Sequence, residues 1–448
     1  MSYRQTLSRL FDLQKFGIKV GLESMRRLLA ALGNPEAGLR LAHIAGTNGK
    51  GSTAAFLAAI AQAAGYRVGL YTSPHLVTFR ERIQLNGIMI TEAETLDLFQ
   101  RVWAVIDESQ PPTFFEFVTA MAFLYFQAQA PDLAIIETGL GGRLDSTNVI
   151  NPLITAITNI SLEHTEYLGT TLTAIATEKA GIIKKGAPLV GGRLEGEPLR
   201  VIKARLAAVG APGKLLGEAY QVTRQAIGQG GVRPAGPVFH YQGPQWNLSD
   251  LAPRLAGPYQ VENAGQAVAL AESLTQLGFD LQPAAVQAGL QKARWPGRAE
   301  RLNPGDWPPD HSGRAPLVLD GAHNPGGAQA FGAFLAQAAA ERVHLIVGVM
   351  ADKDVSGVLS PLIPLASRLY LTRPEYARAA TPEELRDRLI AALGPLPVPA
   401  ELCPNLPAAL QAAAAAAGPR DLVVVSGSLF TVGETLAYLN GEPVVESN

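Results

Sequence analysis

Short apolar runs alternate with longer stretches of helical periodicity through most of the chain. The strand-like runs in the first part are residues 39–45, 67–71, 132–137 and 153–158, with helical stretches such as 52–64 and 172–183 between them. Apolar runs that alternate with helices in this way are typical of parallel sheets, because consecutive parallel strands are joined by helical crossovers. The pattern therefore predicts an α/β fold with a mostly parallel sheet.

The segment 82–90 breaks this pattern. Its apolar positions alternate, and Asn86-Gly87 stands at its centre, which is a strong signal for a type I′ hairpin. Thr91 and Glu94 follow with the spacing of a capping box, so we expect a helix to begin there.

The alternation starts afresh beyond residue 298. Strands are expected at 317–319, 344–349, 369–371 and 422–426, and helices at 326–340, 355–366, 382–393 and 406–417. This second series predicts a smaller, doubly wound, Rossmann-like domain.

We place the domain boundary in the linker formed by Trp295 to Arg298. This choice gives a first domain of residues 1–295 and a second domain of residues 296–448. A stretch rich in Gly, Pro and Gln at 217–258 predicts a small β structure inserted in the first domain.

The composition is that of a folded protein with a large core. The chain has 448 residues, of which 47% are apolar and 17% charged, and this excludes a disordered chain. Its formal charge of −2 provides no general attraction to nucleic acid or to an anionic membrane. The single Cys403 excludes an intramolecular disulfide and a thiolate metal cluster. With no secretory signal and no run long enough to cross a bilayer, we expect a cytoplasmic protein.

The sequence HIAGTNGKGST at 43–53 follows a predicted strand and opens a predicted helix. Its glycines let backbone N–H groups approach an anion, and Lys50 supplies a charge for phosphate oxygens, so a nucleoside triphosphate is the expected ligand. The loop departs from the usual P-loop pattern at Ile44 and Gly51, and the alternative is a simple Gly-rich turn. The candidate nucleotide contacts here are Gly46, Thr47, Asn48, Gly49, Lys50, Gly51 and Ser52.

This loop and several further motifs resemble the folylpolyglutamate synthase and dihydrofolate synthase family, which is related to the Mur ligases. The motifs are GTNGKGS at 46–52, LYTSPHL at 70–76, RERI at 80–83, ETGLGGRLDSTN at 137–148, LEHTEYLG at 162–169, EKAGII at 178–183, LDGAHNP at 319–325 and SGSLFTVGE at 426–434. The resemblance covers nearly the whole chain. It implies a P-loop domain like the central domain of Mur ligases, followed by a glutamate-ligase domain.

Ser73, Glu137 and His164 each lie just past a predicted buried strand. The carboxyl ends of the strands are where open α/β sheets place their ligands, and a site for Mg²⁺ needs few protein ligands, mainly oxygens. The resemblance implies that these three residues hold the metal, and that the site uses ATP and two Mg²⁺ ions. For Ser73 a simple turn before Pro74 is the alternative, and for His164 a structural hydrogen bond.

Lys179 lies within a predicted helix beside Glu178, where a solvated and salt-bridged lysine is the ordinary expectation. The resemblance implies a different state, in which the matching lysine is carbamylated and helps to organise the second metal. A bound K⁺ ion is a further candidate cofactor that the resemblance leaves open.

The glycine-rich sequence at 139–145 does not match a dinucleotide fingerprint, because Leu144 occupies the place of the third glycine. We expect a loop, with Asp145 either stabilising a turn or hydrogen bonding to a heterocycle. The resemblance implies contacts to the pterin part of dihydropteroate here and in the sequence TFFE, whose Thr113 and Glu116 also have capping-box spacing. The candidate pterin residues are Thr113, Phe114, Phe115, Glu116, Leu144, Asp145 and Ser146, with residues 17–20 as a further candidate.

The resemblance places ATP between the domains, in contact with Asn263, Arg298 and Asp320. It implies catalytic roles for Lys50 and Lys179, and it makes His323 and Ser428 candidates to position the incoming glutamate. Ordinary structural roles, such as helix caps for Asn263 and Ser428 and a solvated linker position for Arg298, are the alternatives. In the sequence at 352–354 helix capping is the simplest interpretation.

The implied reaction is ATP-dependent amide ligation through an acyl phosphate, which joins L-glutamate to dihydropteroate, to the γ-carboxylate of a reduced folate, or to both. We favour a bifunctional enzyme, and a monomer by default. The alternatives are a folylpolyglutamate synthase only, a Mur-type amino-acid ligase, or a nucleotide-dependent switch without synthetic activity. The 45 residues before Gly46 are too few for the extra domain of roughly 100 residues that a Mur-type ligase would carry there.

Overall fold

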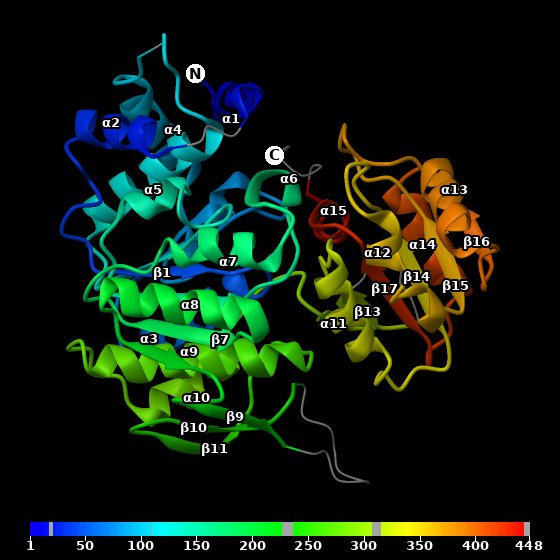
Figure 1. Cartoon of the computed structure of the whole chain (residues 1–448). Helices are drawn as coiled ribbons and strands as arrows, with labels where there is room; N and C mark the ends of the chain where they lie inside the picture. The colour runs from blue at the N-terminus through cyan, green and yellow to red at the C-terminus, as the bar shows by residue number, and fades with distance from the viewer. Residues whose placement is uncertain (18–20, 108, 226–235, 307–314, 443–448) are drawn as a thin grey trace.

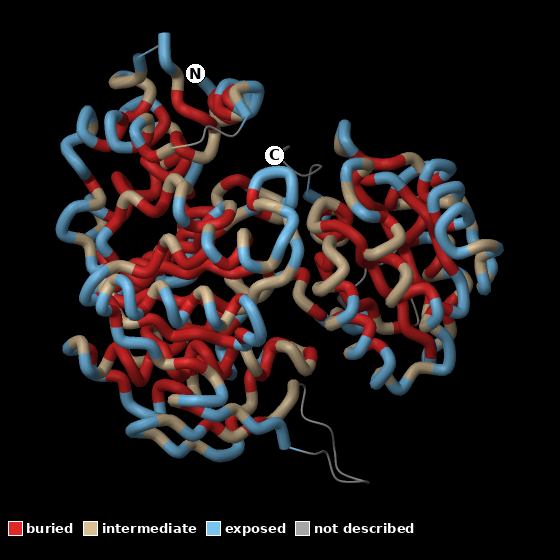
Figure 2. The backbone as a smooth tube through the Cα atoms, in the orientation of Figure 1, coloured by how far each residue is buried: buried red, intermediate tan, exposed pale blue. Residues whose placement is uncertain are grey.

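The computed structural model describes residues 1–17, 21–107, 109–225, 236–306 and 315–442. These residues form two lobes, each built around its own sheet, as Figure 1 shows. Figure 2 shows that each lobe has its own buried centre. The prediction of an α/β fold is confirmed, while the boundary between residues 295 and 296 stays a prediction.

The first lobe contains an eight-stranded sheet in the order β4-β3-β2-β5-β1-β6-β7-β8. Its strands are β1 Leu41–Ala45, β2 Val68–Tyr71, β3 Ile83–Leu85, β4 Ile88–Met89, β5 Leu133–Glu137, β6 Ile154–Asn159, β7 Leu189–Arg193 and β8 Gly213–Leu215. All pairs are parallel except β2 with β3 and β3 with β4. The β3–β4 hairpin confirms the interpretation of Asn86-Gly87, since both residues have the positive φ (53° and 75°) that a type I′ turn requires.

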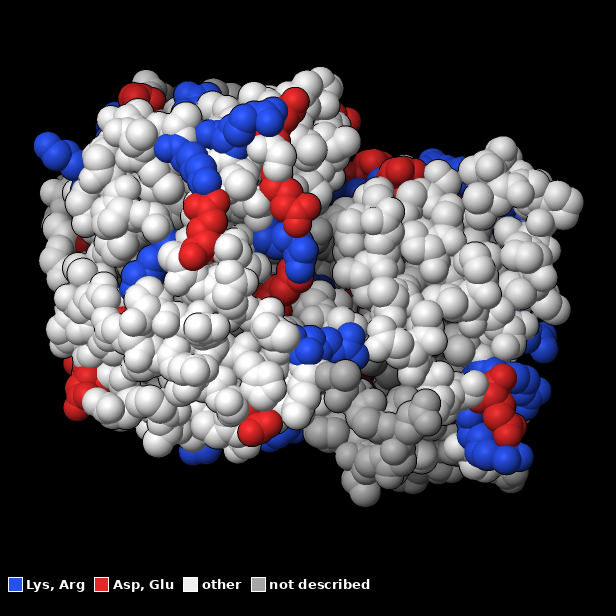
Figure 3. All heavy atoms as spheres, turned by 60° about the horizontal axis from the view of Figure 1, so that its bottom comes forward, with Lys and Arg blue, Asp and Glu red and all other residues white. Residues whose placement is uncertain are grey.

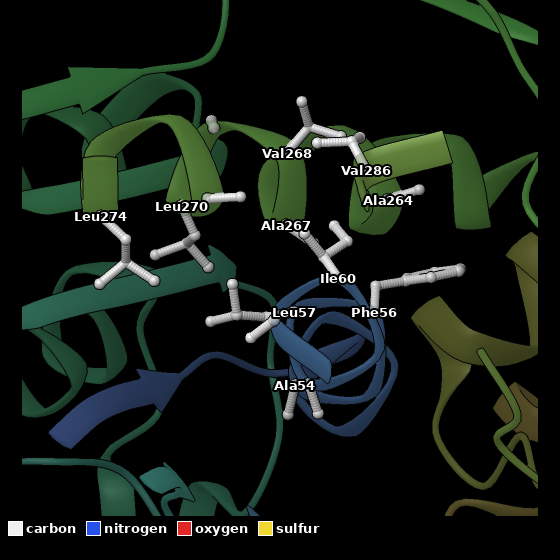
Figure 4. Close-up of a cluster of buried hydrophobic side chains, with 14 of the residues drawn as sticks. Ala54, Phe56, Leu57, Ile60, Ala264, Ala267, Val268, Leu270, Leu274 and Val286 are labelled. Carbon is white, nitrogen blue, oxygen red and sulfur yellow. The ribbon is translucent and has the colours of Figure 1, made fainter. Parts of the chain in front are cut away.

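Helices cover both faces of this sheet. They are α1 Tyr3–Phe11, α2 Glu23–Ala31, α3 Lys50–Ala63, α4 Glu92–Trp103, α5 Phe114–Gln129, α6 Thr165–Leu168, α7 Leu172–Ala180, α8 Gly196–Val209, α9 Tyr259–Thr275 and α10 Pro283–Lys292. Helices α3, α9 and α10 pack on one face, where Ile60 and Leu57 meet Ala267 and Leu270 (Figure 4). Helices α1, α2, α4 and α5 form the core of the other face. Because both faces are covered, the central strands are buried along their whole length.

The predicted β insertion is present as a three-stranded antiparallel sheet. It consists of β9 Gln221–Arg224, β10 Phe239–Gln242 and β11 Asn247–Leu251. The fully buried Glu272 on α9 fastens it to the lobe: its carboxylate accepts hydrogen bonds from the backbone N–H groups of Gln245 (2.8 Å) and Trp246 (2.7 Å) and from the Tyr241 hydroxyl (3.0 Å).

We expect Glu272→Ala to lower the free energy of unfolding by about 3 kcal/mol, because it leaves buried donors without an acceptor. Glu272→Gln keeps one acceptor oxygen and should cost less. Chemical denaturation measures both, with Glu218→Gln in an exposed ion pair as the control. Equal stability of Glu272→Ala and the control would contradict this role.

The second lobe contains a six-stranded sheet in the order β12-β13-β17-β14-β15-β16, parallel except for β12. Its strands are β12 Glu300–Leu302, β13 Leu317–Leu319, β14 Val343–Val347, β15 Arg368–Leu371, β16 Ala400–Leu402 and β17 Leu422–Ser426. Its helices are α11 Pro325–Leu335, α12 Val355–Leu359, α13 Pro382–Leu393, α14 Leu406–Ala416 and α15 Leu429–Asn440.

Two helices in this lobe are shorter than the sequence pattern indicates. Helix α11 ends at Leu335, the last large side chain of the helix that is buried. The expected helix at 355–366 is interrupted, because Pro361 has no N–H to continue the ladder, and a 3₁₀ turn at Ile363–Leu365 follows α12. None of the helices in the described ranges combines the length and hydropathy needed to cross a bilayer.

Candidate functional site

The phosphate loop connects β1 to α3 and has little room for side chains. Gly49 has φ = 86°, and a Cβ there would lie 2.3 Å from Oδ1 of Asn263 on α9. A Cβ at Gly51 would lie 2.5 Å from the ring of Trp295. Both glycines are therefore required by the fold, and Asn263 lies directly against the loop, as expected of a residue that shares its ligand.

Lys50 is the first residue of α3, and its ammonium is held over the loop. It donates to the carbonyl oxygens of Gly46 and Thr47, both at 3.1 Å. The loop is fixed to the end of β6, because the Asn159 side chain accepts a hydrogen bond from the Asn48 N–H (3.0 Å). The N-terminus of α3 and the Lys50 charge thus face the same loop, as an anion site requires.

Glu137 is the last residue of β5 and is buried. Its carboxylate accepts a long hydrogen bond from the backbone N–H of Ser73 (3.3 Å), two residues past β2. Burial raises the pKa of Glu137 to about 7, although the charges of Lys50 and Arg298 act in the opposite direction. A buried carboxylate whose charge is balanced by so few hydrogen bonds and opposite charges is suited to binding a cation.

The loop after β6 and helix α7 bring Glu163 and Lys179 to the same edge. The Lys179 ammonium, only 1% exposed, pairs with the Glu163 carboxylate at 2.6 Å and donates to the Gly46 carbonyl oxygen at 2.8 Å. Burial lowers the pKa of Lys179 to about 8, against the opposing charge of Glu163. Glu178 is not its partner, because Glu178 pairs with Arg143.

His164 is the N-cap residue of α6, with φ = 44°, and its side chain is partly exposed to solvent. Partial burial of the ring lowers its pKa, Glu163 acts against this shift, and the charges of Lys353 and Lys50 add to it. The neutral ring that metal ligation needs is therefore favoured. Among the described residues no three His, Cys, Asp or Glu side chains lie close enough together to hold a metal ion. The predicted set would thus use the Ser73 hydroxyl, one carboxylate and one imidazole, with phosphate and water oxygens for the remainder.

The second lobe contacts the phosphate loop through a pair of side-chain amides. Asn324 donates to Asn48 Oδ1 at 3.0 Å, and Asn48 donates to Asn324 Oδ1 at 3.4 Å. Asn324 also caps α11. His323, half-buried beside it, has Nδ1 2.8 Å from the Gly321 carbonyl oxygen, and burial lowers its pKa to about 4. His323 is therefore a neutral ring next to the nucleotide loop.

Asp320 joins the two lobes. Its buried carboxylate accepts hydrogen bonds from the Tyr259 hydroxyl at the start of α9 (2.8 Å), from Ala299 N–H just after the linker (2.8 Å) and from Ala322 N–H (2.9 Å). Burial raises the pKa of Asp320, and the neighbouring Arg298 acts against that shift. The guanidinium of Arg298 also lies beside Gly321, so Arg298 and Asp320 lie close together, and their contacts to ATP stay a prediction.

The predicted acceptor residues of TFFE begin α5. Thr113 and Glu116 form the capping box, with Thr113 N–H donating to Glu116 Oε2 at 2.7 Å. The half-buried Phe114 stacks on Phe11 of α1 at 5.6 Å, and Phe115 stacks on Tyr71 at 6.1 Å. The structural interpretation of Thr113 and Glu116 is thus confirmed, and their role toward a substrate stays a prediction.

Asp145 is buried and stabilises the glycine-rich loop. It accepts from Leu140 N–H (2.7 Å), from Thr147 N–H (3.0 Å) and from the Thr147 hydroxyl (2.5 Å). The turn-stabilising interpretation of Asp145 is therefore confirmed, and half-buried Leu144 and Ser146 flank it. Of the candidate segment 17–20, residues 18–20 lie outside the described residues.

The remaining candidates have capping roles in the structure. Ser428 is buried and caps α15, its Oγ accepting from the Phe430 N–H at 3.1 Å. Asp354 caps α12, as the sequence pattern predicts, while Asp352 pairs with Arg378 at 3.8 Å. The capped end of α15 lies at the carboxyl edge of β17, the strand that Asp320 adjoins.

Sequence reasoning missed three residues of this site: Glu163, Asn324 and Tyr259. Glu163 and Asn324 lie inside the quoted motifs, next to His164 and His323, and that adjacency was the available signal. Tyr259 had no local signal, because its partner Asp320 is 61 residues away along the chain.

Comparison with known proteins identifies relatives of both lobes. Residues 44–191 match the Mur ligase middle domain, and residues 310–429 match the Mur ligase glutamate ligase domain. The dihydrofolate synthase/folylpolyglutamate synthase of Bacillus subtilis is 37% identical over 86% of this chain and 88% of its own length.

Two solved structures extend the likeness to the whole fold. FolC of E. coli in complex with DHPP and ADP has a TM-score of 0.86 and 29% identity, covering 98% of each chain. The bifunctional folylpolyglutamate synthase/dihydrofolate synthase of Yersinia pestis, complexed with AMPPNP and a Mn ion, has a TM-score of 0.83 and 32% identity, also covering 98% of each chain.

Proposed function

The chain belongs to the folylpolyglutamate synthase/dihydrofolate synthase family of the Mur ligases, and we propose that it is an ATP-dependent ligase that adds L-glutamate to dihydropteroate and to reduced folates. The observation that carries the proposal is the meeting of the phosphate loop, Glu137 and Lys179 at one edge of the first sheet, with Asn324 of the second lobe against the same loop. A nucleotide at the loop would thus lie beside both lobes.

We also propose that the domain boundary lies at residues 295/296 and that the protein is a monomer. Asn263, Arg298 and Asp320 are the proposed ATP contacts of the interlobe region.

The first step is phosphoryl transfer to the acceptor acid. A carboxylate oxygen of the acceptor attacks the γ-phosphorus of ATP, the bond to the β–γ bridging oxygen breaks, and ADP leaves with the electron pair. The backbone N–H groups of the loop and the Lys50 ammonium stabilise the charge on the transferring oxygens. The product is an acyl phosphate, and no side-chain nucleophile is required.

The second step forms the amide. The neutral amino group of glutamate attacks the acyl carbon, the bond from that carbon to the phosphate oxygen breaks, and the ammonium proton passes to solvent or phosphate. His323 and Ser428 are proposed to orient glutamate, since His323 is neutral and Ser428 lies on the second lobe. The pterin residues proposed above hold the acceptor.

Ser73, Glu137 and His164 fit a divalent cation, because they offer a hydroxyl, a carboxylate short of compensating charge and a ring that is readily neutral. The cation, when bound, supplies charge neutralisation for the phosphoryl oxygens. The Yersinia structure with a Mn ion supports the same use of a divalent metal in this family.

Lys179 is proposed as a site of carbamylation. Its lowered pKa of about 8 leaves on the order of a tenth of the side chain as the neutral amine at pH 7, the form that reacts with CO₂. Carbamylation would replace the attraction to Glu163 by repulsion between two anions, so the modified state requires a cation beside it. A K⁺ ion is a further candidate for such a role.

The test is ATP consumption with L-glutamate and one acceptor at a time. We expect phosphate release with dihydropteroate and with tetrahydrofolate, and only background release without an acceptor. Release with tetrahydrofolate alone would indicate a folylpolyglutamate synthase only, and release with a cell-wall precursor alone would indicate a Mur-type ligase. ATP binding with no release under any of these conditions would contradict the proposal and favour a nucleotide-dependent switch.

A further inference from the structure

His43 occupies the middle of β1, between β5 and β6, and is completely buried. Side chains alternate along a strand, so His43 shares a face with Leu41 and Ala45, on the side opposite α3. An imidazole in the centre of a sheet is costly unless its nitrogens are hydrogen bonded. His43 Nδ1 has no partner among the described residues, so the whole compensation comes from Nε2.

The neighbouring groups determine which nitrogen of the His43 ring carries the proton. Nε2 lies 2.8 Å from the Thr147 hydroxyl oxygen, and that hydroxyl donates its only proton to Asp145 Oδ1 at 2.5 Å. Thr147 must therefore accept from His43, which assigns the neutral tautomer with its proton on Nε2. Burial lowers the pKa of His43 to about 3, which agrees with a neutral ring.

Asp145 continues the chain of hydrogen bonds to the glycine-rich loop. Its other oxygen accepts from Leu140 N–H at 2.7 Å, three residues beyond Glu137. The far end of the loop is also held, since the Asn148 amide donates to the Arg143 carbonyl at 3.0 Å and to the Gly181 carbonyl, at 3.2 Å, next to α7. The loop that carries Leu144 and Ser146 is thereby fixed from within.

We propose that His43 is a positioning residue for the acceptor: through Thr147 and Asp145 it holds the loop 139–148 in the conformation that receives the acid substrate. The inference rests on the proposed function, and it assigns no contact between His43 and any ligand. Since His43 lies three residues before Gly46, the same strand that presents the nucleotide loop also orders the acceptor loop. One rigid strand would thus set the relative placement of both substrates.

The test compares variants that remove or keep one hydrogen bond. Thr147→Val removes the hydroxyl at constant shape, and Thr147→Ser keeps it. His43→Met removes the donor, and His43→Gln keeps an N–H near the position of Nε2. We expect Thr147→Val and His43→Met to raise KM for dihydropteroate about tenfold, the change that corresponds to one buried hydrogen bond, with KM for ATP unchanged. For the conservative variants, Thr147→Ser and His43→Gln, KM for dihydropteroate should stay within about threefold of the wild-type value.

Two readouts separate positioning from a merely structural role. His43→Met removes the unpartnered buried Nδ1 and also the hydrogen bond from Nε2 to Thr147, and these two changes have opposite effects on stability. The variant should therefore keep a melting temperature close to that of wild type, and its effect on KM should not add to that of Thr147→Val. An equal rise in KM for dihydropteroate and for ATP would overturn the proposal. So would a rise in KM that follows the fall in melting temperature from one variant to the next.

Hydrogen exchange of residues 139–148 tests the relay without any substrate. We expect faster exchange in Thr147→Val than in Thr147→Ser, and unchanged exchange would overturn the proposal whatever the kinetics show. If wild-type protein used neither dihydropteroate nor tetrahydrofolate, the proposed function would fail, and exchange alone would decide whether the relay orders the loop. Faster exchange with an unchanged acceptor KM would contradict a role in acceptor binding.

Discussion

Lys50→Met is expected to reduce glutamate-dependent phosphate release by a factor of about 10² to 10³, the usual effect of removing one group that stabilises the charge of a transition state. The Lys50 ammonium is held over the phosphate loop, and within the described part of the chain its hydrogen-bond partners are the carbonyl oxygens of Gly46 and Thr47. Its loss should leave the fold intact, since no carboxylate depends on it for a salt bridge among the described ion pairs. Steady-state assays with saturating acceptor measure the effect.

Lys203→Met is the matched control, because Lys203 pairs with Glu218 on the surface of α8 and lies in no proposed site. It should retain wild-type turnover. A Lys50→Met enzyme with turnover within a few-fold of the control would mean that the loop does not carry phosphoryl transfer. The same outcome for Glu137→Ala and His164→Ala would reject the ligase assignment itself.

Glu137→Gln is expected to abolish activity and yet stabilise the metal-free protein at pH 8. The pKa of Glu137 is raised by burial to about 7 from an ordinary value of 4.5, so the folded protein holds this proton more tightly than the unfolded chain. The contribution of Glu137 to stability is therefore complete below pH 4.5 and is lost as the pH rises through 7. A neutral glutamine avoids that loss, which is on the order of 1 to 3 kcal/mol.

Thermal denaturation between pH 5 and pH 9 measures this effect with and without Mg²⁺ and a non-hydrolysable ATP analogue. We expect the stabilisation of wild type by metal and nucleotide to grow as the pH rises through 7, because the ionised carboxylate binds the cation better. In Glu137→Gln we expect neither the loss of stability as the pH rises through 7 nor the growing stabilisation by metal and nucleotide. Parallel pH curves for wild type and variant would show that Glu137 is not the group concerned.

Local sequence patterns predicted the elements that depend on local chemistry. The hairpin at Asn86-Gly87, the capping boxes at Thr91 and Thr113, and the strand-loop-helix unit at 43–53 all follow from residues within a few positions of one another. The helix at 355–366 was predicted wrongly, because apolar periodicity outweighed Pro361 in that interpretation.

The candidate site was predictable only where a motif named its members. Glu163 beside Lys179 and Tyr259 beside Asp320 are pairings between distant segments, and no periodicity encodes them. The turn-stabilising role of Asp145 could be given only as one of two alternatives from the sequence, because its donors are two backbone N–H groups and the Thr147 hydroxyl, whose directions depend on the folded loop.

Charge on the surface adds little to this picture. On the face shown in Figure 3, basic and acidic side chains lie close to one another on the left-hand lobe, while those of the right-hand lobe lie mainly near its margins. This arrangement agrees with the small net charge of −2, and it directs attention to local groups such as Lys50 for the recognition of anions.

The carboxylate of Asp320 has a mechanical consequence. Of its three donors, Tyr259 belongs to the first lobe, whereas Ala299 and Ala322 belong to the second lobe, as Asp320 does. The bond from the Tyr259 hydroxyl is therefore the one of the three that would break if the lobes parted there. Tyr259→Phe removes that bond and keeps the ring that packs against the core of the second lobe, so we expect it to widen the range of angles between the two lobes.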